Sequence, residues 1–198
     1  METDIKDVQS TLGRSFEALK NVCSRKSPLG FLCVAALIDY LSRLAYGRPK
    51  GSRDSERYIK FIEDFFPAPY RNFQYKNGEK DLPQQMYYVL RNGMVHSFTL
   101  VPIGKGRINS IVLCHRREAK RDGYFHLRNY KDKQGRFDDA VLFVMEEFLE
   151  DTKTAAYRLI KKANKKASLR KNILDWYTKN PPVTGGFKIS LVSDCTEV

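Results

Sequence analysis

The stretch SPLGFLCVAALIDYLSRLAYG, Ser27 to Gly47, contributes most to the expected fold. Ser27 followed by Pro28 is typical of a helix N-cap with proline in the first turn. Gly47 is typical of a helix end. The strongly apolar part, Leu29 to Ile38, is about half as long as a membrane-spanning helix. We therefore expect a helix buried in the core of the protein and no membrane association.

Helical periodicity extends on both sides of this stretch. The first helix is predicted over about 5–22, and a third over about 58–66, ended by Pro67 to Pro69. Asp81 to Gln84 resembles a capping box and opens a fourth helix. Phe137, Val141, Val144 and Phe148 predict that a long helix follows near the C-terminal third of the chain, with a shorter one over about 169–177.

Two short segments, Ser110 to His115 and Tyr124 to Arg128, favour strands, and Asp122-Gly123 between them favours a hairpin. A last strand is predicted over Phe187 to Val192. The fold class expected is therefore mainly α, a helical bundle with a small β-hairpin or sheet insertion. We interpret residues 1–198 as a single domain, with a β-rich insertion at about 99–134 and a C-terminal extension at about 180–198.

The charge of the chain indicates a polyanionic partner. Its 35 Lys and Arg against 23 Asp and Glu give a net charge of +12 and a pI near 9.5. Such a field favours nucleic acid, although a soluble basic surface has the same composition. The four cysteines lack CxxC spacing and METDIKDVQS lacks the pattern of a signal peptide, so we expect reduced thiols in a cytoplasmic protein.

The sequence LRNGMVHSF, residues 90–98, contains the strongest candidate site. On an α-helix, Asn92 and His96 would lie about 40° apart, and Arg91 about 140° from His96 but within reach of its long side chain. Gly93 weakens a helix interior and leaves room for a backbone or a phosphate, or else marks the helix end. The same triple also fits a solvated cap or a buried hydrogen-bonded set.

This motif resembles the signature of the HEPN superfamily, in which an arginine and a following polar residue precede a histidine by four to six residues. Arg91, Asn92 and His96 match it. The resemblance implies a compact helical bundle, and in many members a dimeric, metal-independent endoribonuclease of toxin–antitoxin, antiviral or other defence systems. Other members only bind RNA. Where one branch has a tyrosine modified by its antitoxin, this chain has Phe98, so we do not expect that modification here.

The residue types suit metal-independent RNA cleavage by attack of the ribose 2′-hydroxyl. His96 would transfer a proton near neutral pH, and Arg91 would bind phosphate oxygens through two hydrogen bonds. Asn92 would position one of these two side chains. A base and an acid acting together need two histidines, and the motif supplies one. We therefore expect a homodimer in which both motifs meet at a composite site. No cofactor is expected.

A run of six positive charges is the second candidate, as a track for the RNA backbone: Lys161, Lys162, Lys165, Lys166, Arg170 and Lys171. A solvated basic helix end is the alternative interpretation. His115 to Arg121 is a second basic run, more typical of an exposed turn.

No metal site is expected, because Cys114, His115 and His126 are too few for a closed zinc site. The cluster Glu146, Glu147, Glu150 and Asp151 is interpreted as the wet face of the long helix, paired with Lys153 and Arg158.

Three functions therefore remain open from the sequence: an endoribonuclease, an RNA-binding module that does not cleave, and a structural protein whose basic face binds an acidic protein. The HEPN resemblance also implies an antitoxin protein as a partner of the endoribonuclease.

Overall fold

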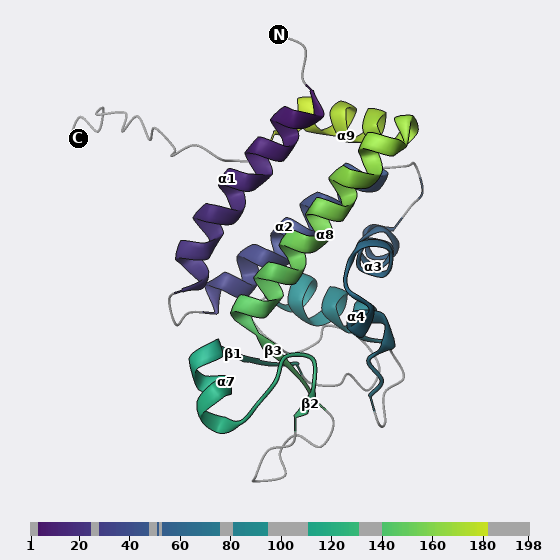
Figure 1. Cartoon of the computed structure of the whole chain (residues 1–198). Coiled ribbons are helices and arrows are strands. Elements are labelled where there is room, and N and C mark those ends of the chain that lie inside the picture. Colours follow the sequence, from purple (N-terminus) through teal and green to yellow (C-terminus); the bar gives the residue numbers. More distant parts are fainter. Residues whose placement is uncertain are drawn as a thin grey trace, which may run out of the picture.

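The computed structural model describes residues 4–24, 28–47, 51, 53–75, 81–94, 111–130 and 140–181. It is mainly helical with a small sheet, so the predicted fold class is confirmed (Figure 1). The helices are α1 (Ile5–Cys23), α2 (Leu29–Tyr46), α3 (Asp54–Phe65), α4 (Ala68–Asn72), α5 (Leu82–Gln85), η1 (Met86–Met94), α7 (Arg116–Asp122), α8 (Met145–Lys165) and α9 (Ala167–Lys179). The strands are β1 (Ile111–Cys114), β2 (Asn129–Tyr130) and β3 (Ala140–Val144).

Helix α2 is the centre of the bundle, as the sequence predicts. It packs against α1, α3, α8, α9 and η1. Among the described helices it alone is long and apolar enough to cross a membrane, but 56% of it is buried within the protein, as in a core helix. At Gly30, an added Cβ would lie 2.9 Å from the Met145 sulfur and 3.2 Å from the Cys23 Cα, so a side chain there would force Met145 to move where α2 meets α8.

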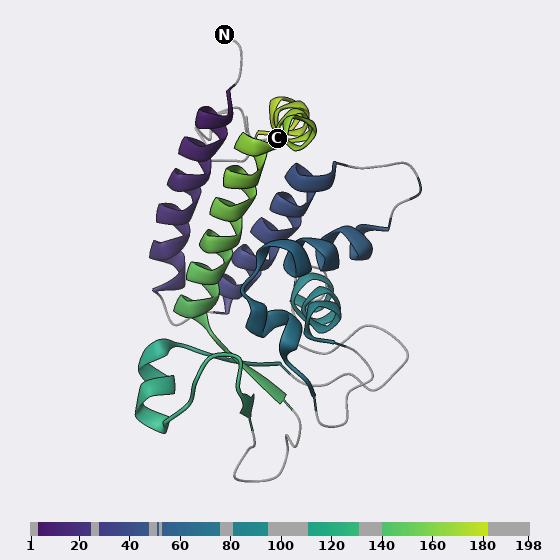
Figure 2. The ribbon, with the colours of Figure 1, turned by 45° about the vertical axis from the view of Figure 1, so that its right-hand side comes forward.

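The sheet and α7 lie at one end of the helices, and α9 lies at the other (Figures 1 and 2). The strand order is β1-β3-β2, with β1 parallel and β2 antiparallel to β3. All five residues of β3 are buried, as expected for the central strand of a covered sheet. Because β3 continues directly into α8 at Val144, the sheet is anchored to the core of the bundle.

The predicted hairpin is wrong. The segment before Gly123 is the helix α7, which His115 and Glu118 cap, and β1 pairs with β3 instead. The predicted helix start is also wrong, because Ala140 to Val144 is a strand and α8 begins at Met145. A continuous apolar run such as AVLFV fits a buried strand as well as a helix. The predicted strand over Phe187 to Val192 and the Ser27 cap lie outside the described residues.

Phe148 of α8 lies where the helical bundle packs against the sheet. Its ring is fully buried, 6.2 Å from the ring centre of Phe31 and 5.0 Å from that of Phe143. We expect Phe148→Ala to lower the free energy of unfolding by about 3–5 kcal/mol. Phe125→Ala, at a ring that is 70% exposed, should change it by less than about 0.5 kcal/mol. Urea denaturation of both variants measures the difference, and equal losses would contradict this packing.

Candidate functional site

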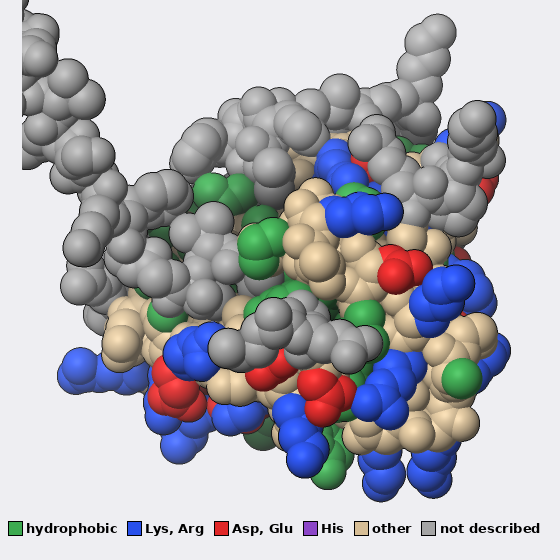
Figure 3. All heavy atoms as spheres, turned by 90° about the horizontal axis from the view of Figure 1, so that it is seen from above, with side chains coloured by type: hydrophobic (Ala, Val, Ile, Leu, Met, Phe, Trp, Pro, Cys, Tyr) green, Lys and Arg blue, Asp and Glu red, His purple; other side chains and the backbone are tan. Residues whose placement is uncertain are grey.

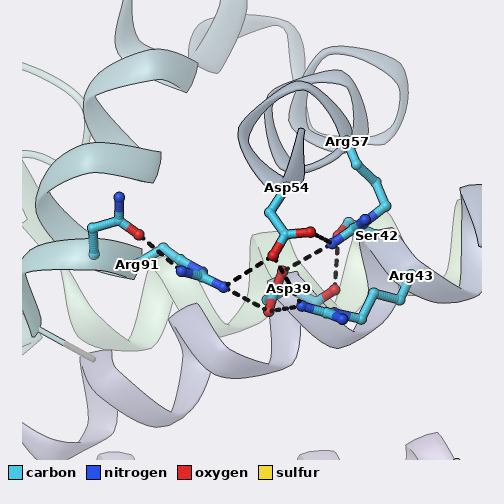
Figure 4. Close-up of polar contacts among 7 residues, drawn as sticks. Asp39, Ser42, Arg43, Asp54, Arg57 and Arg91 are labelled. Atoms are coloured by element: carbon cyan, nitrogen blue, oxygen red, sulfur yellow. Dashed lines mark hydrogen bonds and ion pairs between the residues drawn. The ribbon is translucent and has the colours of Figure 1, made fainter. Parts of the chain in front are cut away.

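Arg91 lies on η1 and faces two carboxylates from other helices (Figure 4). Its Nη2 is 3.5 Å from Asp39 Oδ2 on α2 and 3.7 Å from Asp54 Oδ2 on α3. The Arg91 side chain is 14% exposed. The motif arginine is therefore held at a junction of three helices, at the edge of the protein interior.

The same two carboxylates hold two more arginines. Arg43 Nη2 lies 3.3 Å from Asp39 Oδ2 and 3.4 Å from Asp54 Oδ2. Arg57 Nη2 lies 2.8 Å from Asp54 Oδ1 and 3.8 Å from Asp39 Oδ1. Three guanidinium groups against two carboxylates leave these five groups, which we call the ion cluster, with a net charge of +1. The ion cluster therefore has an excess of positive charge.

The ion cluster also has hydrogen-bonding capacity that the described residues do not meet. The Arg57 side chain is only 2% exposed, and its Nε donates to Ser42 Oγ over 3.4 Å. Its Nη1 and Asp39 Oδ1 are buried and lack a hydrogen-bond partner among the described residues. Because both atoms are closed off from solvent, their unmet hydrogen bonds lower the stability that the ion cluster contributes.

The ion cluster and the burial around it determine the protonation states of Asp54 and Tyr58. Partial burial disfavours the ionised form of Asp54, but the hydrogen bond from Arg57 and the positive charges of Arg57, Arg43 and Arg91 outweigh burial and lower the pKa of Asp54. Burial, with the negative charge of Asp39, raises the pKa of Tyr58 far above its ordinary value. Near neutral pH the carboxylate is therefore charged and the phenol is neutral.

Asn92 contacts Arg91 directly. Arg91 Nη1 donates to the Asn92 side-chain oxygen over 2.9 Å, and the Arg91 guanidinium lies 5.5 Å from the ring centre of Tyr87. The contact with the ring and the hydrogen bond to Asn92 both restrict the orientation of the guanidinium.

The motif segment is a π-helix through Met94, and not the α-helix that the sequence predicts. Such helices are rare and often occur at functional sites. The described helix ends at Met94, so the predicted angles between His96 and the other two motif residues fall outside the described residues. His96 lies outside the described residues. Gly93 is buried, so its backbone is covered by protein.

The lysine run lies where α8 ends and α9 begins. All six of its basic residues are exposed. Arg170 pairs with Asp4 over 2.8 Å, and the Lys162 ammonium lies 5.1 Å from the ring centre of Phe65. Figure 3 views the molecule from the end at which α9 lies, with Lys and Arg side chains around that face and acidic side chains among them.

The remaining histidines contact acidic residues. His126 Nδ1 accepts from the Val144 amide over 3.0 Å, and its Nε2 lies 2.9 Å from the Tyr70 hydroxyl, which donates to Asp151. His115 lies 3.7 Å from Glu146. Within the described part of the chain, no three His, Cys, Asp or Glu side chains are grouped to hold a metal ion.

Sequence reasoning missed the ion cluster. Asp39 and Arg43 are four apart in an otherwise apolar helix, and Asp54 and Arg57 are three apart on the next helix. A charged pair inside an apolar helix is a signal of a buried polar site. The sequence does not show that Arg91, almost forty residues further on, joins both pairs.

Comparison with known proteins found no match: no family model, no curated protein and no solved structure is similar enough to this chain to identify it.

Asp54→Asn tests the ion cluster through its pH dependence. Because the pKa of Asp54 is lowered in the folded protein, its ionised form stabilises the fold above the unfolded-state pKa of about 4, and this contribution is lost as pH falls through the lowered value. We expect Asp54→Asn to lower the free energy of unfolding by about 2 kcal/mol at pH 7. The difference from wild type should vanish in strong acid.

Asp122→Asn is the matched control, because Asp122 pairs with Arg121 at an exposed site. It should change stability by less than about 0.5 kcal/mol at pH 7. Urea denaturation of the two variants and wild type across pH 2–7 makes the comparison. A loss for Asp54→Asn that is independent of pH would contradict the charge argument.

Proposed function

We propose that this protein is a metal-independent endoribonuclease of HEPN type, which cleaves RNA by attack of the ribose 2′-hydroxyl on the adjacent phosphate. The observation that carries the proposal is the position of Arg91, oriented by Asn92 and two carboxylates in a cluster with net positive charge. A guanidinium that is already oriented binds phosphate oxygens without first losing its own freedom. Its charge would stabilise the negative charge that grows on phosphorus.

In this proposal His96 transfers the proton, Arg91 binds the phosphate beside it, and Asn92 positions Arg91 through their hydrogen bond. One positioned histidine typically contributes 10²–10⁴-fold to a rate. Because the motif offers one histidine per chain, we propose that two chains form a homodimer with both motifs at one composite site. A role in defence or stress response and a toxin–antitoxin pairing belong to the same proposal, and they rest on the HEPN resemblance. A cytoplasmic location also belongs to it, and it rests on the cysteine spacing and the N-terminal sequence.

An RNA-binding module without cleavage is the second candidate, and the exposed lysine run favours it. Five of its basic residues lie on two adjoining helix ends, at Lys161, Lys162, Lys165, Lys166 and Lys171. A dense basic surface attracts RNA whether or not catalysis is retained. Cleavage by the purified protein separates the two candidates. A protein partner that co-purifies, with no response to RNA, would instead support a protein-binding role.

We expect purified wild-type protein to cleave total RNA in EDTA, and His96→Ala to abolish this activity. Arg91→Lys keeps a positive charge but loses the planar pair of donors, so we expect at least about a hundredfold loss of rate. His115→Ala removes a histidine elsewhere in the chain and should leave cleavage unchanged. Circular dichroism confirms that each variant is folded. Cleavage that survives His96→Ala, or that requires Mg²⁺, would contradict the proposed mechanism.

We also expect RNA affinity to fall steeply with salt. Measured with His96→Ala to prevent cleavage, changing Lys161, Lys165, Lys166 and Lys171 to Gln should reduce the slope of log K against log salt by about 0.7 for each phosphate that the protein no longer neutralises. Arg117→Gln with Lys120→Gln, on the exposed face of α7, is the control and should leave the slope unchanged. An equal effect of both sets would mean that only net charge matters.

A further inference from the structure

A groove of about 400 Å³ lies between α1 and α8, and it shares no residue with the ion cluster. The two helices lie side by side (Figures 1 and 2). Leu12, Phe16 and Ile160 line the groove, and each is at most 5% exposed, so they form its apolar floor. The volume is within the range of small-molecule sites, about 300–1,000 Å³.

Tyr157 lines the groove but leaves its ring in solvent. It is 60% exposed, while the aromatic rings of the buried core are at most 9% exposed. A single exposed tyrosine is common on a protein surface, but this ring lies beside the apolar floor of the groove. An exposed tyrosine ring offers a flat face on which a planar group can stack.

Gly13, in the middle of α1, lines the same groove as Tyr157. Glycine weakens a helix interior relative to alanine, and here no close contact requires it, because an added Cβ would have nothing within 4 Å. Its effect is to keep this side of the groove open, with only backbone at that point. A large side chain at position 13 would therefore narrow the groove on the α1 side.

Positive charge flanks Tyr157 along α8. Lys153 and Lys161 stand four residues before and after it, on the same exposed face of the helix. Lys165 continues this face into the lysine run. Glu150 also lines the groove, one helical turn before Lys153, and partly offsets the charge of Lys153, so phosphates would be bound more strongly toward the C-terminal end of α8. Gln9 and Thr154 supply hydrogen-bonding groups to the groove.

We propose that this groove binds the bases of single-stranded RNA, with one base stacked on Tyr157 and the adjoining phosphates on Lys153 and Lys161. A row of phosphate-binding cations interrupted by an aromatic platform is the arrangement by which proteins bind single strands. Paired bases are already stacked, so a duplex would contact only the lysines. The inference rests on the proposed function for RNA as the ligand, but it does not require cleavage.

The test is fluorescence anisotropy of a labelled 12-nucleotide RNA, single-stranded or in a duplex, with every variant made on His96→Ala in EDTA. Tyr157→Ala should weaken binding of the single strand about fivefold to a hundredfold, the range for one base–aromatic stack. Tyr157→Phe should restore it. Gly13→Leu should weaken it similarly while leaving the melting temperature unchanged or higher, since leucine favours a helix. Duplex affinity should stay unchanged in all of them.

Phe125→Ala is the matched control, because it removes another exposed ring, next to α7. It should leave single-strand affinity unchanged. Wild-type affinity in Tyr157→Ala or Gly13→Leu, or an equal loss with the duplex or with Phe125→Ala, would overturn the groove as a base site. Conversion of a dimer into a monomer by Tyr157→Ala, measured by sedimentation, would also overturn it and assign the groove to a second copy. If the variants bind RNA as expected and the wild-type protein does not cleave RNA, only the proposed enzymatic activity is rejected, and the groove remains supported.

Discussion

The structure around the candidate site depends on two carboxylates that three arginines share. Without Asp39 and Asp54, three guanidinium groups would repel one another at the junction of α2, α3 and η1, and Arg57 would be a buried charge without a counter-ion. With both carboxylates in place, each arginine is directed toward the same point. The ion cluster therefore joins the three helices and orients Arg91 at once, so that stability and the proposed chemistry have the same physical origin.

The two surfaces that we propose to bind RNA differ in the chemical groups that they offer. The ion cluster holds an arginine with fixed geometry, which suits recognition of one phosphate. The exposed face of α8 carries flexible lysines and one aromatic ring, which suits a strand of any sequence. In the proposed function the second surface retains the substrate, and the first acts on a single bond. The central helix α2 contacts both η1 and α8, so one rigid element separates and supports the two surfaces.

Local patterns in the sequence were sufficient for the helical class, for α2 as the core helix, and for the cap at Asp81. They were insufficient where contacts between distant segments determine the local structure. The run AVLFV forms a strand because it pairs with β1. The acidic residues of α8 contact residues from distant segments instead of helix neighbours: Glu147 contacts Arg116, and Asp151 contacts Tyr70 and His126. The sequence named Arg91 and Asn92 as candidates. It did not indicate the carboxylates that contact Arg91, because these come from distant segments, and it did not indicate the π-helix.

The central claim is that the oriented Arg91 serves cleavage in which the RNA's own 2′-hydroxyl is the nucleophile. The most direct measurement is mass spectrometry of the new RNA ends formed by the purified protein in EDTA. The account predicts a 2′,3′-cyclic phosphate on one fragment and a 5′-hydroxyl on the other, and no cleavage at a position whose ribose carries a 2′-O-methyl group. A 3′-hydroxyl with a 5′-phosphate, or cutting at the methylated position, would contradict it.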